Sequence, residues 1–318
     1  MTRSDSPPAA VGRDHPQLGW NDQVAAAVAE AMPGWFREDL GFEADWTSVA
    51  LVPPTATGRL ALVARQAGVL AGLPAAAVVT ATDPDLVWEP LLTDGDRLEP
   101  GTVVAHLAGP LRSVLQVERV LLNLLGRLCG VATAARHLVD AVAGTDCRIY
   151  DTRKTLPGWR LLDKYAVRCG GGFSHRLGLY DAILIKDNHL AAVAGAGIDP
   201  AAAVVQARKF IERTFPPSRA AKMVVEIEVE SPAQAAVALP AGPDILLLDN
   251  MTAAELQECV ALRNEIAQGV ILEASGGITL SSVRAVAETG VDRISTGMPT
   301  HAAPWLDLGL DWELSQSQ

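Results

Sequence analysis

From about residue 145 onward, short apolar runs alternate along the chain with longer segments that mix apolar and polar positions. Continuous apolar runs are typical of parallel strands covered on both faces, and the mixed segments are typical of the covering helices. The six predicted strands are residues 147–150, 182–185, 223–229, 245–248, 270–274 and 293–295. The predicted helices are residues 158–168, 200–214, 232–238, 253–267 and 280–289. This repetition predicts an α/β fold containing a TIM-like β/α barrel, either closed or open.

The first part of the chain mixes helical and strand patterns. An Ala-rich helix is predicted over residues 21–38, a strand over 60–64, and a helix of small residues over 70–81. Residues 113–144 keep apolar positions at helical spacing and predict one long helix or two. We therefore expect a sandwich-like amino-terminal α/β domain.

The predicted domain limits follow from these patterns. We expect a disordered tail over 1–17, rich in Ser, Pro and Asp, and the amino-terminal domain over 18–127. The barrel is predicted over 128–297, and residues 298–318 are predicted to pack back on the amino-terminal domain.

Composition narrows the class of protein. The 318 residues are 49% hydrophobic and 20% charged, with a net charge of -11, which argues against a nucleic-acid partner. The four cysteines are far apart and lack a CxxC motif, so neither a zinc cluster nor a disulfide framework is predicted. No signal peptide or membrane-spanning segment is predicted either. We therefore expect a cytoplasmic protein with no membrane partner.

Positive charge is concentrated in one part of this acidic chain. Between Arg148 and His189 there are eight Lys or Arg against four Asp. Basic side chains gathered in a cleft attract small anions, and arginine matches the geometry of carboxylate and phosphate groups. This segment therefore predicts an anion-binding site.

Polar residues also lie at or just past the carboxyl ends of successive predicted strands. In a barrel of parallel strands, the carboxyl ends converge on one rim, where the active site lies. One polar residue after a strand is an ordinary loop feature, but six strands in succession favour a shared site. The residues concerned are Asp151, Arg153, Lys186, Glu228, Asp249, Ser275 and Thr296.

The motifs resemble those of the quinolinate phosphoribosyltransferase family. They are ERVLLNLLGRLCGVAT, DTRKTLPGWRLLDKYAVRCGGG, HRLGLYDAILIKDNHL, EIEVE, ILLLDN and EASGGI, in that order. The likeness extends from about Asp45 to about His301. It implies transfer of phosphoribosyl from phosphoribosyl pyrophosphate to quinolinate with decarboxylation, giving nicotinate mononucleotide, pyrophosphate and CO₂ in de novo NAD biosynthesis.

The resemblance also implies roles for the basic residues. Those around the quinolinate carboxylates are Arg153, His175, Arg176 and Lys186, while Lys154 lies on the phosphoribosyl pyrophosphate side. Thr152 is a further expected substrate-binding residue. Arg119 is implied to complete the site of the neighbouring subunit in a homodimer, or in a higher oligomer.

The acidic and glycine-rich positions are implied to hold the activated sugar. Glu228 and Asp249 match positions that bind the ribose hydroxyls and help to organise Mg²⁺ indirectly, and with Lys154 and Lys186 they form the expected catalytic set. Glu226 is expected to support them, with a lysine as one candidate partner. The 5-phosphate is assigned to two loops, Ser275, Gly276 and Gly277 in one and Thr296, Gly297 and Met298 in the other.

Some positions depart from the family pattern, and other functions stay open. Ser174 stands where asparagine is usual, Cys129 replaces a common serine, and STGMPTHAA differs from SVGALTHSA. The first alternative is a related branch associated with molybdenum transport. The others are a barrel that binds a ligand without catalysis and a Schiff-base aldolase that uses Lys186.

Overall fold

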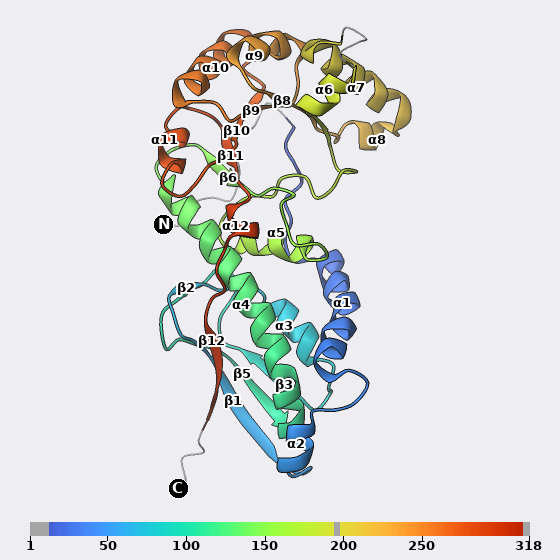
Figure 1. Cartoon of the computed structure of the whole chain (residues 1–318), viewed down its shortest axis with the longest axis vertical. Helices are drawn as coiled ribbons and strands as arrows, with labels where there is room; N and C mark the ends of the chain where they lie inside the picture. The colour runs from blue at the N-terminus through green and yellow to red at the C-terminus, as the bar shows by residue number, and fades with distance from the viewer. Residues whose placement is uncertain (1–12, 194–197, 314–318) are drawn as a thin grey trace. The chain divides into compact units, whose positions relative to one another are not determined.

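The computed structural model describes residues 13–193 and 198–313, and these divide into two compact units (Figure 1). The parallel-sheet unit contains residues 13–17, 137–154 and 173–297, apart from the gap just stated. The antiparallel-sheet unit contains residues 18–136, 155–172 and 298–313. The chain therefore passes between the units several times, whereas we expected two successive domains with one return at the carboxyl end.

The parallel-sheet unit is built on six parallel strands in the order β6-β11-β10-β9-β8-β7. Their bounds are β6 Arg148–Tyr150, β7 Ile183–Ile185, β8 Val225–Val229, β9 Ile245–Asp249, β10 Ile271–Ser275 and β11 Arg293–Ser295. All six strands were predicted. Within the described residues the sheet is open, with β6 and β7 as its edges.

Helices connect these strands (Figure 1). They are α6 Asp187–Val193, α7 Pro200–Thr214, α8 Pro217–Ala220, α9 Pro232–Ala238, η2 Leu239–Ala241, α10 Ala253–Ile266 and α11 Val283–Ala287. The start of α10 is fixed by a capping box, in which Thr252 and Glu255 satisfy each other's backbone N–H groups. Helix α11 begins three residues later than predicted, because Thr279 and Ser282 form a hydrogen-bonded turn there.

The second unit contains a four-stranded antiparallel sheet in the order β12-β1-β5-β3 and a two-stranded sheet of β2 and β4. The strands are β1 Thr57–Ala64, β2 Gly68–Val69, β3 Val87–Pro90, β4 Arg97–Leu98, β5 Val103–Pro110 and β12 Leu308–Trp312. The pairing of β12 with β1 places residues 308–312, near the carboxyl end, in the amino-terminal sheet.

The helices of this unit are α1 Asp22–Leu40, α2 Trp46–Leu51, α3 Leu73–Thr80, α5 Arg160–Cys169 and α12 Met298–His301. Residues 113–141 of the segment expected to form one or two helices belong to a single helix, α4 Leu111–Ala141. Leu62 of β1, Leu107 of β5 and Leu121 of α4 share one buried core. Gly130 of α4 is needed for close packing, because a Cβ there would lie 2.1 Å from the carbonyl oxygen of Pro304.

The predicted disordered tail is wrong for residues 13–17, and residues 1–12 lie outside the described part. Arg13 donates to the carbonyl oxygen of Met223, and His15 is only 3% exposed. Long-range polar contacts thus order this segment despite its polar composition. None of the described helices has the length and apolar character needed to cross a membrane.

Candidate active site

A cavity of about 540 Å³ lies at the carboxyl ends of the parallel strands. Eleven residues predicted for the site line it: Thr152, Arg153, Lys154, His175, Arg176, Lys186, Glu228, Asp249, Ser275, Gly276 and Gly277. Four of these are Lys or Arg and two are carboxylates, so the cavity is cationic in a protein of net charge -11. This balance suits a polyanionic ligand.

Two arginines form the most basic part of the cavity. Burial lowers the pKa of Arg176, and the nearby Arg153 lowers it further, against the opposing effect of Glu226. The Nε atom of Arg153 is buried and has no hydrogen-bond partner among the described residues. A carboxylate bound between these two guanidinium groups would satisfy the unpaired donor and relieve the repulsion.

Lys186 and Glu228 form a second part of the cavity lining. The Nζ atom of Lys186 lies 2.8 Å from the Glu228 carboxylate, and its side chain is 43% exposed. The backbone N–H of Lys186 donates to Nδ1 of His189 at 2.9 Å. The backbone of residues 186–189 is thus held by His189, while the ammonium group of Lys186 remains accessible to a ligand.

Asp249, Asn250 and Gly276 form the third part. The side-chain amide of Asn250 donates to Asp249 at 2.6 Å, and its backbone N–H donates to the carbonyl oxygen of Ser275. Asn250 has a left-handed backbone, with φ of 54°. A Cβ at Gly276 would lie 2.2 Å from Oδ1 of Asn250, and Gly276 itself has φ of 97°. Only glycine fits this close approach without strain.

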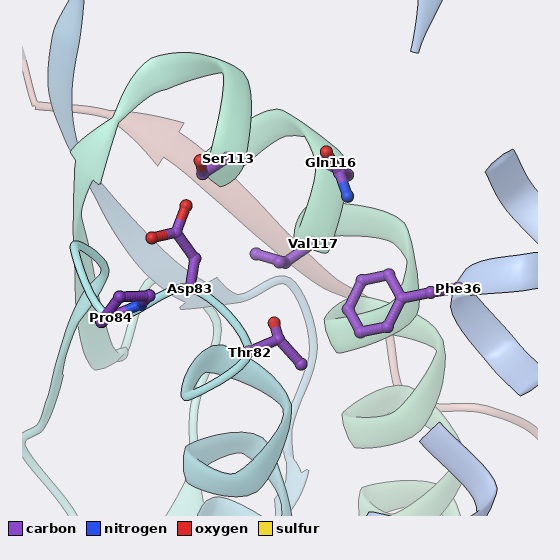
Figure 2. Close-up of a pocket in the computed structure, with 7 residues that line it drawn as sticks. All are labelled: Phe36, Thr82, Asp83, Pro84, Ser113, Gln116 and Val117. Carbon is purple, nitrogen blue, oxygen red and sulfur yellow. The ribbon is translucent and has the colours of Figure 1, made fainter. Parts of the chain in front are cut away.

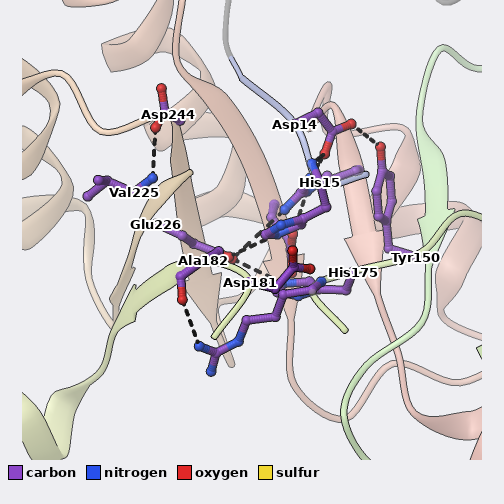
Figure 3. Close-up of polar contacts among 12 residues, drawn as sticks. Asp14, His15, Tyr150, His175, Asp181, Ala182, Val225, Glu226 and Asp244 are labelled. Carbon is purple, nitrogen blue, oxygen red and sulfur yellow. Dashed lines mark hydrogen bonds and ion pairs between the residues drawn. The ribbon is translucent and has the colours of Figure 1, made fainter. Parts of the chain in front are cut away.

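His175 connects the cavity to a buried polar cluster (Figure 3). Its Nε2 atom lies 3.3 Å from Glu226 and 3.4 Å from Glu273, and both carboxylates are fully buried. A lysine was one candidate partner for Glu226, but its described partners are His15, His175 and Arg293. Histidine and arginine side chains pair with Glu226 because they reach its buried carboxylate from other segments of the same unit.

Arg293 is the central cation of this cluster. It is 1% exposed, forms ion pairs with Glu273 and Asp14, and stacks on the ring of Tyr150. The Tyr150 hydroxyl donates to the other oxygen of Asp14. Buried charges are tolerated only when they are paired, and this arrangement supplies the pairs.

The two histidines of the cluster have opposite pKa shifts. Burial lowers the pKa of His15 and outweighs its hydrogen bond to Glu226. Burial also acts to lower the pKa of His175, but the charges of Glu226 and Glu273 overcome it and raise the pKa to about 9. The N–H of Arg176 donates to Nδ1 of His175, a contact open only to the neutral ring. We expect the charged form to prevail, because it pairs with two buried carboxylates.

His15, His175 and Glu226 also have the side-chain types of a metal site, with ligand atoms within 4.8 Å of one another. However, the Glu226 carboxylate already lies 3.4 Å from His15 and 3.3 Å from His175, and Arg293 supplies positive charge beside it. We therefore interpret the three residues as part of a buried network of ion pairs.

Comparison with known proteins identifies the family. The model for the amino-terminal domain of quinolinate phosphoribosyl transferase matches residues 45–129, and the model for its carboxyl-terminal domain matches residues 131–311. The chain belongs to the quinolinate phosphoribosyltransferase family. This confirms the family predicted from the motifs.

Curated relatives and solved structures support membership of the quinolinate phosphoribosyltransferase family. The carboxylating nicotinate-nucleotide pyrophosphorylase of Mycobacterium leprae is 41% identical over 277 residues, covering 86% of this chain and 93% of that protein. The human protein of the same name is 38% identical over 286 residues, covering 89% and 91%. The structure of the Francisella tularensis nicotinate-nucleotide pyrophosphorylase matches with a TM-score of 0.83 at 34% identity, covering 94% of this chain and 100% of that one.

Four residues that were predicted for the site do not line the cavity. Arg119 is exposed on α4 in the antiparallel-sheet unit, and Met298 belongs to that unit as well. Thr296 is buried, with its N–H bonded to the carbonyl oxygen of Tyr150 and its hydroxyl bonded to that of Ile278. Gly297 follows it and is also buried. The N–H and hydroxyl of Thr296 thus donate to carbonyl oxygens within the fold. The neighbouring Ser295 lines the cavity instead.

Sequence reasoning missed four residues that do line the cavity: Leu184, Leu247, Asn250 and Ser295. Two are apolar strand residues that look like ordinary core positions. Asn250 could have been found, because it directly follows Asp249 in the ILLLDN motif of the quinolinate phosphoribosyltransferase family.

A second cavity, of about 230 Å³, lies in the antiparallel-sheet unit (Figure 2). Its lining residues are Phe36, Thr82, Asp83, Pro84, Ser113, Gln116 and Val117. The only charged one is Asp83, whose pKa is lowered by a hydrogen bond from Ser113. A cavity with one carboxylate and no cation does not suit the anionic substrates of quinolinate phosphoribosyltransferases.

Proposed function

We propose that the cationic cavity of the parallel sheet transfers phosphoribosyl from phosphoribosyl pyrophosphate to quinolinate, with loss of CO₂, in de novo NAD biosynthesis. The observation that carries this proposal is the lining of the cavity, where four cations surround a space that also holds two carboxylates. A pyridine with two adjacent carboxylates and a sugar with two phosphorylated positions together need both kinds of group. The relatives named for the carboxylating reaction support the same assignment.

The basic residues provide binding and orientation. Arg153 and Arg176 hold the quinolinate carboxylates together with His175 and Lys186. The pyridine nitrogen is already a nucleophile, so holding it in line with the anomeric carbon supplies much of the rate enhancement. Once the nitrogen is ribosylated, its positive charge stabilises the carbanion left as CO₂ departs. No covalent enzyme intermediate is needed.

The activated sugar occupies the acidic and glycine-rich part of the cavity. Glu228 and Asp249 bind the ribose hydroxyls, Ser275, Gly276 and Gly277 hold the 5-phosphate, and Lys154 contacts the pyrophosphate. Mg²⁺ fits this donor set, because it binds through one or two carboxylates together with substrate phosphates and neutralises charge on a leaving group. Lys154 adds a further positive charge where the leaving group develops negative charge.

The proposal includes a homodimer. Arg119 is exposed on α4, and it is assigned to the quinolinate carboxylates of the neighbouring subunit. A cytoplasmic location is also part of the proposal, and it is supported by four cysteines that are all free.

Lys186 argues against the aldolase alternative. A Schiff-base lysine must be a desolvated or otherwise activated amine. Lys186 is 43% exposed and forms an ion pair with Glu228, which suits anion binding instead.

The proposed function is tested by mixing the protein with Mg²⁺, quinolinate and phosphoribosyl pyrophosphate. We expect nicotinate mononucleotide, detected by its ultraviolet absorbance, together with one CO₂ per product. Nicotinate in place of quinolinate should give little product, because it lacks the second carboxylate. Failure to consume quinolinate would overturn the proposal and favour the molybdenum-associated branch or a barrel that only binds its ligand.

A further inference from the structure

The loop that carries His175 and Arg176 is held by a segment from the other end of the sequence. The side-chain amide of Gln17 accepts the backbone N–H of Ser174 at 2.7 Å and donates to the Ser174 carbonyl oxygen at 3.2 Å. The same amide also donates to the carbonyl oxygen of His15. Gln17 therefore binds Ser174 on both sides, as a neighbouring strand would.

This loop depends on tertiary contacts because it contains no helix and only one isolated bridge, from Phe173 to Tyr150. One further contact comes from Asp151, which accepts the N–H of His175 at 2.8 Å. An irregular loop loses conformational entropy when it is fixed, so each anchoring contact matters for its orientation. Gln17 provides two such contacts directly beside the residues that line the cavity.

The side chain of His15 packs against the ring of His175. The two rings lie with centroids 4.3 Å apart and planes tilted by 35° (Figure 3). The side chain of His15 is fully buried, and its Nε2 atom lies 3.4 Å from Glu226, the same carboxylate that His175 contacts. His15 thus limits where the His175 ring and its carboxylate partner can move.

The segment is itself fixed at its start. Asp14 binds Arg293 and Tyr150, and Arg13 donates to the carbonyl oxygens of Met223 and Ala220. The partners of Arg13 and Asp14 lie in several segments of the parallel-sheet unit, so residues 13–17 are packed as part of that unit.

We propose that residues 13–17, which we call the N-terminal strap, position His175 and Arg176 for the pyridine dicarboxylate. The strap itself does not line the cavity, so its residues act through the loop and not on the substrate. This inference rests on the proposed function, and it makes the strap specific for one of the two substrates. The loop after β10 and the acidic residues that hold the activated sugar make no described contact with the strap.

The test compares His15→Ala, Gln17→Ala and His15→Gln with the wild-type protein. In the two alanine variants we expect the KM for quinolinate to rise about tenfold, with kcat and the KM for phosphoribosyl pyrophosphate changed by less than about twofold. His15→Gln keeps a side-chain donor and should recover most of the loss. Gln17 is exposed, so its replacement tests the strap even if His15→Ala fails to fold.

The matched control is His106→Ala. His106 also pairs with a glutamate, Glu313, at 3.1 Å, but it belongs to the antiparallel-sheet unit. It should leave both KM values unchanged. Calorimetric binding of quinolinate without the second substrate gives a readout that does not depend on turnover.

The possible results separate the strap from the proposed function. An unchanged quinolinate KM in both alanine variants, or an equal loss in every kinetic parameter, would overturn the positioning role while leaving the function intact. If the wild-type protein binds quinolinate without turnover, the function fails and the calorimetric affinities alone decide on the strap. If the wild-type protein does not bind quinolinate at all, both proposals are wrong.

Discussion

Two glutamates on strand β8 occupy contrasting surroundings although they are only two residues apart. Glu228 lines the cavity, its side chain is 10% exposed, and its described partner is the half-exposed Lys186. Glu226 is fully buried among His15, His175 and Arg293. Both charges are paired, but only the Glu228 pair can open to admit a ligand.

Depth along the strand therefore decides what a carboxylate does here. At the rim, by which we mean the cavity lining with Glu228 and Lys186, solvent and substrate compete for the cation, so the ion pair is weak and exchangeable. In the interior, by which we mean the buried cluster around Glu226 and Arg293, no water can replace a lost partner, so each pair is required once the charge is buried. The rim is expected to determine activity, and the interior is expected to determine stability and the orientation of His175.

The largest expected effect comes from breaking the interior. Arg293→Ala would leave Glu226 and Glu273 with the two histidines as their remaining partners, so we expect stability to fall by about 3–5 kcal/mol. The measurement is the urea unfolding midpoint followed by circular dichroism. Arg284→Ala is the control, because Arg284 forms an exposed i,i+4 pair with Glu288 and should matter by at most about 1 kcal/mol. Equal effects of the two variants would contradict the contrast between rim and interior.

The next effect concerns the rim. Arg176→Ala and Lys186→Ala should each lower kcat/KM by about 10²- to 10³-fold, because each removes a charged donor from the anion site. Neither should change the urea midpoint much. Among the described residues the Arg176 guanidinium has one hydrogen bond, a long one of 3.4 Å to the carbonyl oxygen of Ala182, and the ion pair of Lys186 with Glu228 is partly exposed. Lys209→Ala, an exposed position on α7, is the control. Near-normal turnover in either variant would remove these residues from the site.

The same contrast explains how much the sequence revealed. All six strands were predicted, because strands covered on both faces are largely apolar, as ILLL is in β9, although β8 contains two glutamates. Part of the charged rim was predictable, because Lys186, Glu228 and Asp249 lie at or just past the carboxyl ends of such strands. The family resemblance then supplied the roles, including the acidic pair Glu228 and Asp249.

The interior was not predictable by the same reasoning. Arg293 lies at the start of a predicted strand, and no periodicity indicates that it pairs with Asp14, 279 residues earlier in the chain. Polar composition suggested disorder for residues 13–17. Composition carries no information about contacts that form only in the folded unit. Thr296 was assigned to phosphate from its place at a strand end, and its hydrogen bonds to the carbonyl oxygens of Tyr150 and Ile278 were likewise not predictable from the sequence.

A smaller effect is expected at the glycine turn of the rim. Gly276→Ala places a Cβ against Asn250 in a left-handed backbone, so we expect about 1–2 kcal/mol of strain and a higher KM for phosphoribosyl pyrophosphate. Gly144→Ala is a close control, because its φ is +85° but nothing lies within 4 Å of the added Cβ. The difference between the two variants measures the contact with Asn250. If their KM values match, the turn does not shape the sugar site.

The smallest expected effect is the pH dependence of the interior. The pKa of His15 is lowered in the folded protein, mainly by burial, so its contribution to stability is complete above the unfolded value of about 6.5 and is lost as the pH falls. The pKa of His175 is raised to about 9, so its contribution is complete below about 6.5 and is lost as the pH rises through 9.

Urea midpoints measured from pH 5 to pH 10 should therefore decline at both ends, with separate causes. His15→Gln should remove part of the acid-side decline and leave the alkaline side unchanged, because glutamine does not titrate and His175 keeps its carboxylates. An acid-side decline that is identical in the variant would mean that other groups cause it. The strap would then be held by its fixed charges at Asp14 and Arg293, and the neutrality of His15 would not matter for its docking.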